Sequence, residues 1–210
     1  LSINISEKCR DVLRSDLFQK YFYDIKVKED SDTKQLFKVV KDNKVGGFRY
    51  ATSVGGTISG FHGHFLLLDD PLNAVDALSE VKIKNVNEWI DNVIFSRKVD
   101  NDVSVVILVM QRLHENDTTG YLLSKNKNIK HICLPALLSE NIQPTDLKKY
   151  YVDDLLDSKR LSKDILEQKR IEMGDYAFAM QYLQQIVPKA GSFFDVSKLL
   201  TINNIDEKEF

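Results

Sequence analysis

Phe65-Leu66-Leu67-Leu68-Asp69-Asp70-Pro71 is the most informative stretch of this chain for its fold class. Four consecutive apolar residues without polar alternation are typical of a strand buried on both faces, as in a parallel sheet. Pro71 ends the strand, because proline has no N–H to donate to a sheet. A second run of this kind, Val103–Met110, is followed by a polar cluster that begins with Gln111. We therefore expect two buried strands, each followed by polar side chains.

Periodic segments on both sides of these strands predict the remaining elements. Apolar residues at helical spacing predict helices, and apolar runs around turn residues predict a hairpin. The expected elements are helices over Ser2–Ser15, Asp76–Lys98, Ser162–Met173 and Asp175–Gln185 and around Tyr121–Leu123, a hairpin of Leu36–Val40 with Gly47–Ser53, a short strand at His131–Leu134 and a long surface excursion over Ser139–Leu161. Gly174 separates the last two helices.

Strands that alternate with helices predict an α/β fold with a mainly parallel sheet flanked by helices. Ligands of open α/β sheets bind outside the carboxyl ends of the strands. This rule puts Asp69, Asp70 and Gln111 at the edge of the sheet where chemistry is expected.

Composition excludes several classes of protein. The 210 residues include 29 Lys and Arg and 31 Asp and Glu, a formal net charge of −2, so no basic excess indicates nucleic-acid binding, although a local basic face is still allowed. Cys9 and Cys133 lie far apart without metal-type spacing, which favours a reducing compartment. The apolar runs are much shorter than the roughly 20 residues that cross a bilayer, so we expect no membrane contact.

The pair Asp69-Asp70 has two possible roles. In nucleotide hydrolases, an acidic residue at the end of such a strand holds Mg²⁺, usually through water, and a second carboxylate beside it can orient or deprotonate the attacking water. Alternatively, the pair only ends a strand and begins the turn before Pro71.

The phosphate loop that usually accompanies such a strand, G-x-x-x-x-G-K-[ST], is absent from the sequence. Gly55 and Gly60 have the glycine spacing, but Phe61-His62 stand where Lys and Ser or Thr are required. Gln111 can hydrogen-bond a γ-phosphate or the attacking water, or it is simply polar where a strand meets solvent. Arg112 can contact phosphate, or it can pair with Glu115 or Asp117.

Together these segments resemble the large terminase subunit of tailed bacteriophages, the motor that packages DNA into proheads. The blocks that carry the resemblance are, in chain order, Gly47–Gly60, Leu67–Pro71, Ala77–Glu80 with Trp89 and Arg97, Met110–Asp117 with Gly120, Leu134–Ala136, and Tyr182–Gln185 with Pro188, Gly191 and Phe194. Each block is weak alone, and the order of the six is specific.

The resemblance implies a P-loop NTPase-like fold of the ASCE type, in which Asp69 is the Walker B residue that holds Mg²⁺ through water. It implies that Asp70 is the catalytic carboxylate, and that Gln111 and Arg112 couple ATP hydrolysis to movement. Many relatives have glutamate at the position of Asp70. The implied cofactor and substrate are Mg²⁺ and ATP. The implied partners are double-stranded DNA, a portal protein, a small terminase subunit and a ring of copies, in the bacterial host cytoplasm.

The resemblance also implies a fragment. Residues 1–187 correspond to the later part of the ATPase domain, and residues 188–210 to a linker toward a nuclease domain. The phosphate loop would precede Leu1, so we expect this chain alone to bind neither ATP nor Mg²⁺ tightly and to hydrolyse ATP poorly.

Two other interpretations stay open. One is a decayed prophage remnant or interaction module without catalysis, which exposed sheet edges would favour. The other, more remote, is a metal-dependent hydrolase that uses His62, His64, Asp69 and His114.

Overall fold

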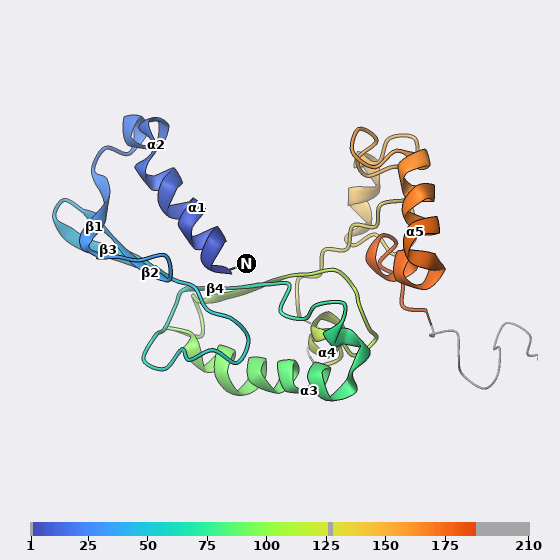
Figure 1. The fold of residues 1–210 in the computed structure, drawn as a ribbon, viewed down its shortest axis with the longest axis horizontal. Coiled ribbons are helices and arrows are strands. Elements are labelled where there is room, and N and C mark those ends of the chain that lie inside the picture. Colours follow the sequence, from blue (N-terminus) through green and yellow to red (C-terminus); the bar gives the residue numbers. More distant parts are fainter. Residues whose placement is uncertain (1, 126–127, 188–210) are drawn as a thin grey trace, which may run out of the picture. The chain divides into compact units, whose positions relative to one another are not determined.

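The computed structural model describes residues 2–125 and 128–187. The chain divides into two compact units, Leu1–Met110 and Gln111–Phe210 (Figure 1). The predicted linker, residues 188–210, lies outside the described residues.

The first unit begins with two helices, α1 (Ser2–Arg14) and α2 (Asp16–Tyr21). The first of them confirms the helix expected over Ser2–Ser15. Ser15 separates them and caps α2, because its side chain accepts a hydrogen bond from the Phe18 N–H at 3.3 Å. Figure 1 shows α1 beside the antiparallel strands, where Arg10 and Arg14 pair with Asp32 of β1.

A three-stranded antiparallel sheet follows, made of β1 (Ile25–Asp32), β2 (Leu36–Lys41) and β3 (Lys44–Tyr50). Strands β2 and β3 confirm the predicted hairpin. Asp42 and Asn43 form its turn with φ values of +50° and +61°, which is the type I′ pattern that suits the twist of a hairpin. Strand β1 was not predicted from the sequence.

The other strands of the first unit, β4 (Phe65–Asp69) and β5 (Val105–Val109), form a parallel pair in which Phe65 lies opposite Val105 and Asp69 opposite Val109. The connection between them contains the 3-10 turn η1 (Asp76–Leu78), α3 (Glu80–Trp89), the π-helix η2 (Ile90–Ile94) and the 3-10 turn η3 (Phe95–Arg97). It confirms the helix expected over Asp76–Lys98, with breaks. Its buried residues include Ile83, Val86 and Ile90.

Two expectations about this sheet are wrong. The strands are not buried on both faces, because Leu68 is buried whereas Phe65 is 75% and Leu67 54% exposed. The sheets are not mainly parallel either, since three of the five described strands are antiparallel. The coarser prediction of a mixed α/β protein with parallel strands is confirmed, and its parallel sheet has two strands.

The second unit contains α4 (Thr118–Lys125), the 3-10 helix η4 (Thr145–Tyr150) and α5 (Lys163–Gln181). Gly174 interrupts α5 with φ +80° and ψ 159°, which confirms the predicted break between two helices. The small core consists of Ala136, Leu155, Leu166 and Phe178, against which Tyr182 and other apolar side chains pack.

Two predictions in this unit need correction. The strand expected at His131–Leu134 is reduced to a single bridge between Cys133 and Gln143. The segment 139–161 is not wholly at the surface, because Ile142 is fully buried and Leu155 lies in the core. The buried side chains of Ile142 and Leu155 therefore attach this segment to the unit, although its composition is polar.

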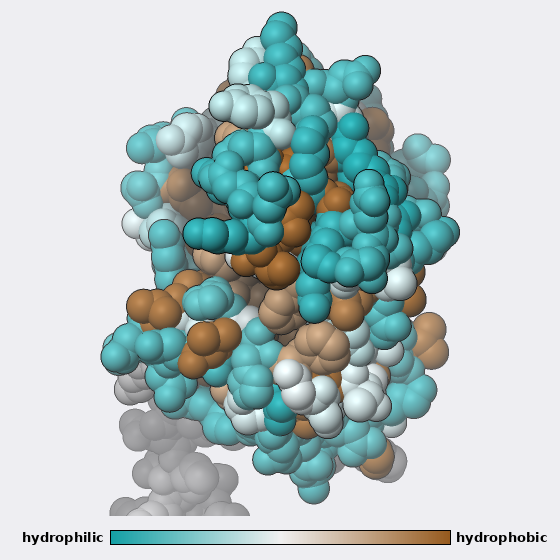
Figure 2. All heavy atoms as spheres, turned by 90° about the vertical axis from the view of Figure 1, so that its left-hand side faces the viewer, coloured by the Kyte–Doolittle hydropathy of each residue, from teal (hydrophilic) through white to brown (hydrophobic). Residues whose placement is uncertain are grey.

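Exposed hydrophobic side chains are scattered among hydrophilic ones on the face drawn in Figure 2. Among the described residues, no helix combines the length and apolar character required to cross a bilayer.

Candidate functional site

The carboxyl end of β4 holds the two acids that the sequence singles out. Asp69 is the last residue of the strand and lies in register with Val109 of β5. Asp70 follows, and its backbone N–H donates to the Val109 carbonyl at 2.9 Å. Both aspartates are exposed. The parallel pair therefore presents two adjacent carboxylates to solvent, at the edge where ligands of α/β sheets bind.

Asp70 has an unusual backbone conformation. Its φ of +43° lies in the left-handed region, which costs a non-glycine residue on the order of 1 kcal/mol and which aspartate tolerates better than most. The chain then turns through Pro71, and Leu72 is buried. The packed Leu72 and the Asp70 hydrogen bond fix this turn, and strain of this kind is often found at functional sites.

Two neighbouring carboxylates suit a hard divalent cation. Mg²⁺ is commonly bound through one or two carboxylates and keeps several water ligands. His62 and His64 are exposed in the segment before β4. Within residues 2–125 and 128–187, no group of three or more His, Cys, Asp or Glu side chains is arranged to hold a metal.

The glycine-rich segment 55–60 contacts Tyr50, the last residue of β3. The Tyr50 hydroxyl donates to the Thr57 carbonyl at 2.8 Å, and the Tyr50 ring stacks on Phe61 with centroids 4.2 Å apart. A Cβ on Gly56 would lie 2.2 Å from Thr52 Oγ1. A compact loop accounts for this glycine without a phosphate.

Gln111 and Arg112 open the second unit. Gln111 is exposed, whereas the side chain of Arg112 is 14% exposed. Its Nε lies 3.1 Å and 3.0 Å from the two carboxylate oxygens of Asp117. Its Nη2 donates to the carbonyls of His114 and Glu115 at 3.2 Å and 3.3 Å. Of the two alternatives for Arg112, pairing with Asp117 is the one observed.

Asp117 organises the turn between Arg112 and α4. Its side chain is fully buried and accepts hydrogen bonds from the N–H groups of Leu113 at 2.9 Å, His114 at 3.3 Å and Gly120 at 2.9 Å. The Gly120 bond caps the N-terminus of α4. A Cβ on Gly120 would lie 1.9 Å from the Glu115 carbonyl oxygen, so the turn requires glycine there.

Blocks of the resemblance that are far apart in sequence meet in this unit. The Arg112 N–H donates to Gln184 Oε1 at 3.2 Å, and the Ala136 N–H donates to the Tyr182 carbonyl at 2.7 Å. Asp117, Gly120 and Gln184 all lie in the sequence blocks named above, but the sequence assigned no role to the last two. An aspartate directly before a helical segment is an N-cap signal, and this signal pointed to Asp117.

Arg112 also affects two titratable side chains. Burial, together with the charge of Arg112, lowers the pKa of His131 from its ordinary value of 6.5. Burial raises the pKa of the Cys133 thiol, and the charge of Arg112 opposes this rise. A neutral imidazole and a protonated thiol are therefore favoured near the turn.

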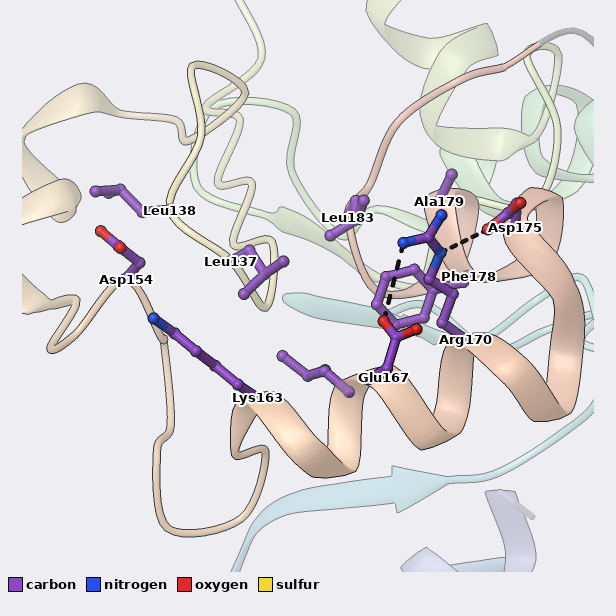
Figure 3. Close-up of a pocket in the computed structure, with 11 residues that line it drawn as sticks. Leu137, Leu138, Asp154, Lys163, Glu167, Arg170, Asp175, Phe178, Ala179 and Leu183 are labelled. Atoms are coloured by element: carbon purple, nitrogen blue, oxygen red, sulfur yellow. Dashed lines mark hydrogen bonds and ion pairs between the residues drawn. The ribbon is translucent and has the colours of Figure 1, made fainter.

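An open pocket of about 830 Å³ lies along α5 (Figure 3). Its apolar lining includes Leu137, Leu166 and Phe178, and charged side chains stand at its rim. Figure 3 shows Arg170 between the carboxylates of Glu167 and Asp175, at 3.9 Å and 2.6 Å. No pattern in the sequence predicted this pocket.

The structure places Asp69 with Asp70 in the first unit and Gln111 with Arg112 in the second. No model of a known protein family matches the chain, and no curated protein matches it.

Proposed function

We propose that this chain is part of the ATP-hydrolysing motor of a bacteriophage terminase large subunit, which packages double-stranded viral DNA. The observation that carries the proposal is the exposed pair Asp69 and Asp70 at the carboxyl end of a parallel strand. The chain order of the resembling blocks, and the hydrogen bonds between several of them in the second unit, also support it.

In this proposal the two aspartates have different roles. Asp69 holds Mg²⁺ through water, and Asp70 accepts a hydrogen bond from the water that attacks the γ-phosphate of ATP. Mg²⁺, when bound, neutralises charge on the phosphates. Because the Asp70 N–H is bonded to Val109, the backbone that carries this carboxylate is fixed before substrate arrives.

Gln111 and Arg112 couple ATP hydrolysis to movement in this proposal. The exposed amide of Gln111 responds to the γ-phosphate or to the attacking water. The Arg112 guanidinium is engaged by Asp117, so we assign Arg112 a positioning role in the turn that carries Gln111. Double-stranded DNA, a portal protein, a small terminase subunit and other copies of the chain are the proposed partners, in the host cytoplasm.

The first test is the gene itself. We expect the DNA upstream of the Leu1 codon to encode, in frame and within on the order of 100 codons, a G-x-x-x-x-G-K-[ST] loop. The 210-residue chain contains no such loop, so we expect it to show no Mg²⁺-dependent ATP hydrolysis by itself.

The second test uses the protein from the complete reading frame. Asp69→Asn and Asp70→Asn should each lower its ATPase kcat by about 100-fold or more, because each removes a charge needed at the reacting phosphate. Asp102→Asn is the matched control, an exposed acid before the opposite end of β5, and should leave kcat unchanged. Full turnover in both site variants would contradict the proposal.

A second candidate is an interaction module without catalysis. One observation favours it: the alternate residues of β4 and β5 form an exposed apolar face that consists of Phe65, Leu67, Val105, Ile107 and Val109. Stop codons or frameshifts upstream of Leu1, with no phosphate loop, would support this candidate over the motor.

A further inference from the structure

The end of α5 and the turn after β5 are joined by one side chain. Gln184 lies 72 residues from Arg112 in sequence, and its Oε1 accepts the Arg112 N–H at 3.2 Å. Its Nε2 donates to the Gln181 carbonyl at 2.6 Å, so the same amide holds the last turn of α5. Both functional groups of this amide are therefore engaged, one toward each segment.

The backbone of Gln184 adopts an unfavourable conformation in this arrangement. Its φ is +54°, in the left-handed region that glutamine rarely adopts. Strain of this kind persists only where surrounding contacts fix the conformation. Here the Gln185 N–H donates to the Ala179 carbonyl at 2.9 Å, and the Tyr182 carbonyl accepts from Ala136. The segment 182–185 is thus bonded to α5, to Ala136 and to the turn.

At the other end of the link, the turn is itself rigid. Asp117 holds the Arg112 guanidinium and three backbone N–H groups, and Gly120 fits closely beneath the Glu115 carbonyl. We therefore expect a displacement of Arg112 to move the whole turn 112–120 as one body. Gln111 precedes Arg112 directly, so its backbone follows the same displacement.

We propose that Gln184 is a latch residue that couples the turn 111–120 to the chain leaving α5, so that a movement at either end is transmitted to the other. The link itself does not depend on the proposed function. Its role in the response of Gln111 to nucleotide does rest on that function. Hydrogen-bonded side chains are one means by which energetic coupling passes between segments, and such coupling acts equally in both directions.

Amide hydrogen exchange on the 210-residue chain tests the link. Gln184→Asn retains an amide and a residue type that accepts left-handed φ, but it is one methylene shorter. It should speed exchange of the Arg112 amide by about fivefold, the factor expected for one hydrogen bond of ordinary net strength. Gln185→Asn is the matched control and should leave that amide unchanged, because Gln185 contributes its backbone N–H to Ala179.

A double-mutant cycle separates coupling from a local structural role. Asp117→Asn, which loosens the turn, should speed exchange of the Gln185 amide in the wild-type background and have no effect there once Gln184→Asn is present. Arg112→Lys replaces Asp117→Asn if the latter chain does not fold. Equal effects at Gln185 with and without Gln184 would overturn the latch. These measurements use no nucleotide, so their outcome is independent of any ATPase result.

Discussion

The carboxylate of Asp117 lies where a charged group is normally unfavourable. Its side chain is fully buried, yet the Arg112 guanidinium balances its charge, and three backbone N–H groups occupy its oxygens. A buried ion pair is favourable only when such additional hydrogen bonds compensate for the loss of water. Removal of one partner therefore costs far more than the net contribution of the pair.

We expect Asp117→Ala to lower the free energy of unfolding by about 3–5 kcal/mol, because it leaves the Arg112 charge and three N–H groups without their acceptor. Urea unfolding followed by circular dichroism measures the change. The control, Asp175→Ala, removes an aspartate whose side chain is 79% exposed and which pairs with Arg170, and should cost less than about 1 kcal/mol. Equal losses in the two variants would contradict the buried-pair interpretation.

Among the elements, α5 shows how a single residue limits a helix. Gly174 adopts φ +80° and ψ 159°, a region that is essentially restricted to glycine, so the two apolar-periodic segments cannot join. The sequence predicted this break because glycine stands between two helical patterns. It did not predict β1, where Lys28, Glu29 and Asp30 are poor strand formers and pairing with β2 outweighs propensity.

Gly174→Ala should destabilise the protein by about 1–3 kcal/mol through backbone strain alone, since a Cβ there would meet no atom within 4 Å. Thermal and urea unfolding measure this change. Gly47→Ala is the control: a Cβ at this strand position would lie 3.9 Å from the Val39 side chain, and we expect a change within about 0.5 kcal/mol. A gain of stability with more helix in Gly174→Ala would mean that α5 prefers to be continuous.

The candidate site was predictable in part for a physical reason. An apolar run that ends in acids places Asp69 and Asp70 at a strand terminus, and that placement is local. Burial depends on what covers a sheet, so the exposure of Phe65 and Leu67 was not available from their neighbours in sequence. The link between Arg112 and Gln184 spans 72 residues, and no spacing rule applies at that range.

For the molecule as a whole, the lowered pKa of His131 predicts a dependence of stability on pH. In the folded protein, burial and the nearby charge of Arg112 lower the pKa of this imidazole below 6.5. The unfolded chain therefore takes up the proton first as the pH falls. The contribution of His131 to stability is present above about pH 6.5 and is lost as the pH falls through the folded pKa.

Urea unfolding from about pH 8 to about pH 5 should show this loss, and His131→Gln should reduce it. An unaltered profile in His131→Gln would mean that other groups cause the acid sensitivity.

The buried Asp117 carboxylate also constrains the length of the chain around it. Because one side chain reaches back to Arg112, Leu113 and His114 and forward to Gly120, the number of residues between these contacts is set by its reach. One residue inserted between Arg112 and Gly120 would move at least one partner out of register. Relatives of this chain should therefore vary in length elsewhere, for example near the exposed positions 140 and 141, and keep this turn free of insertions and deletions.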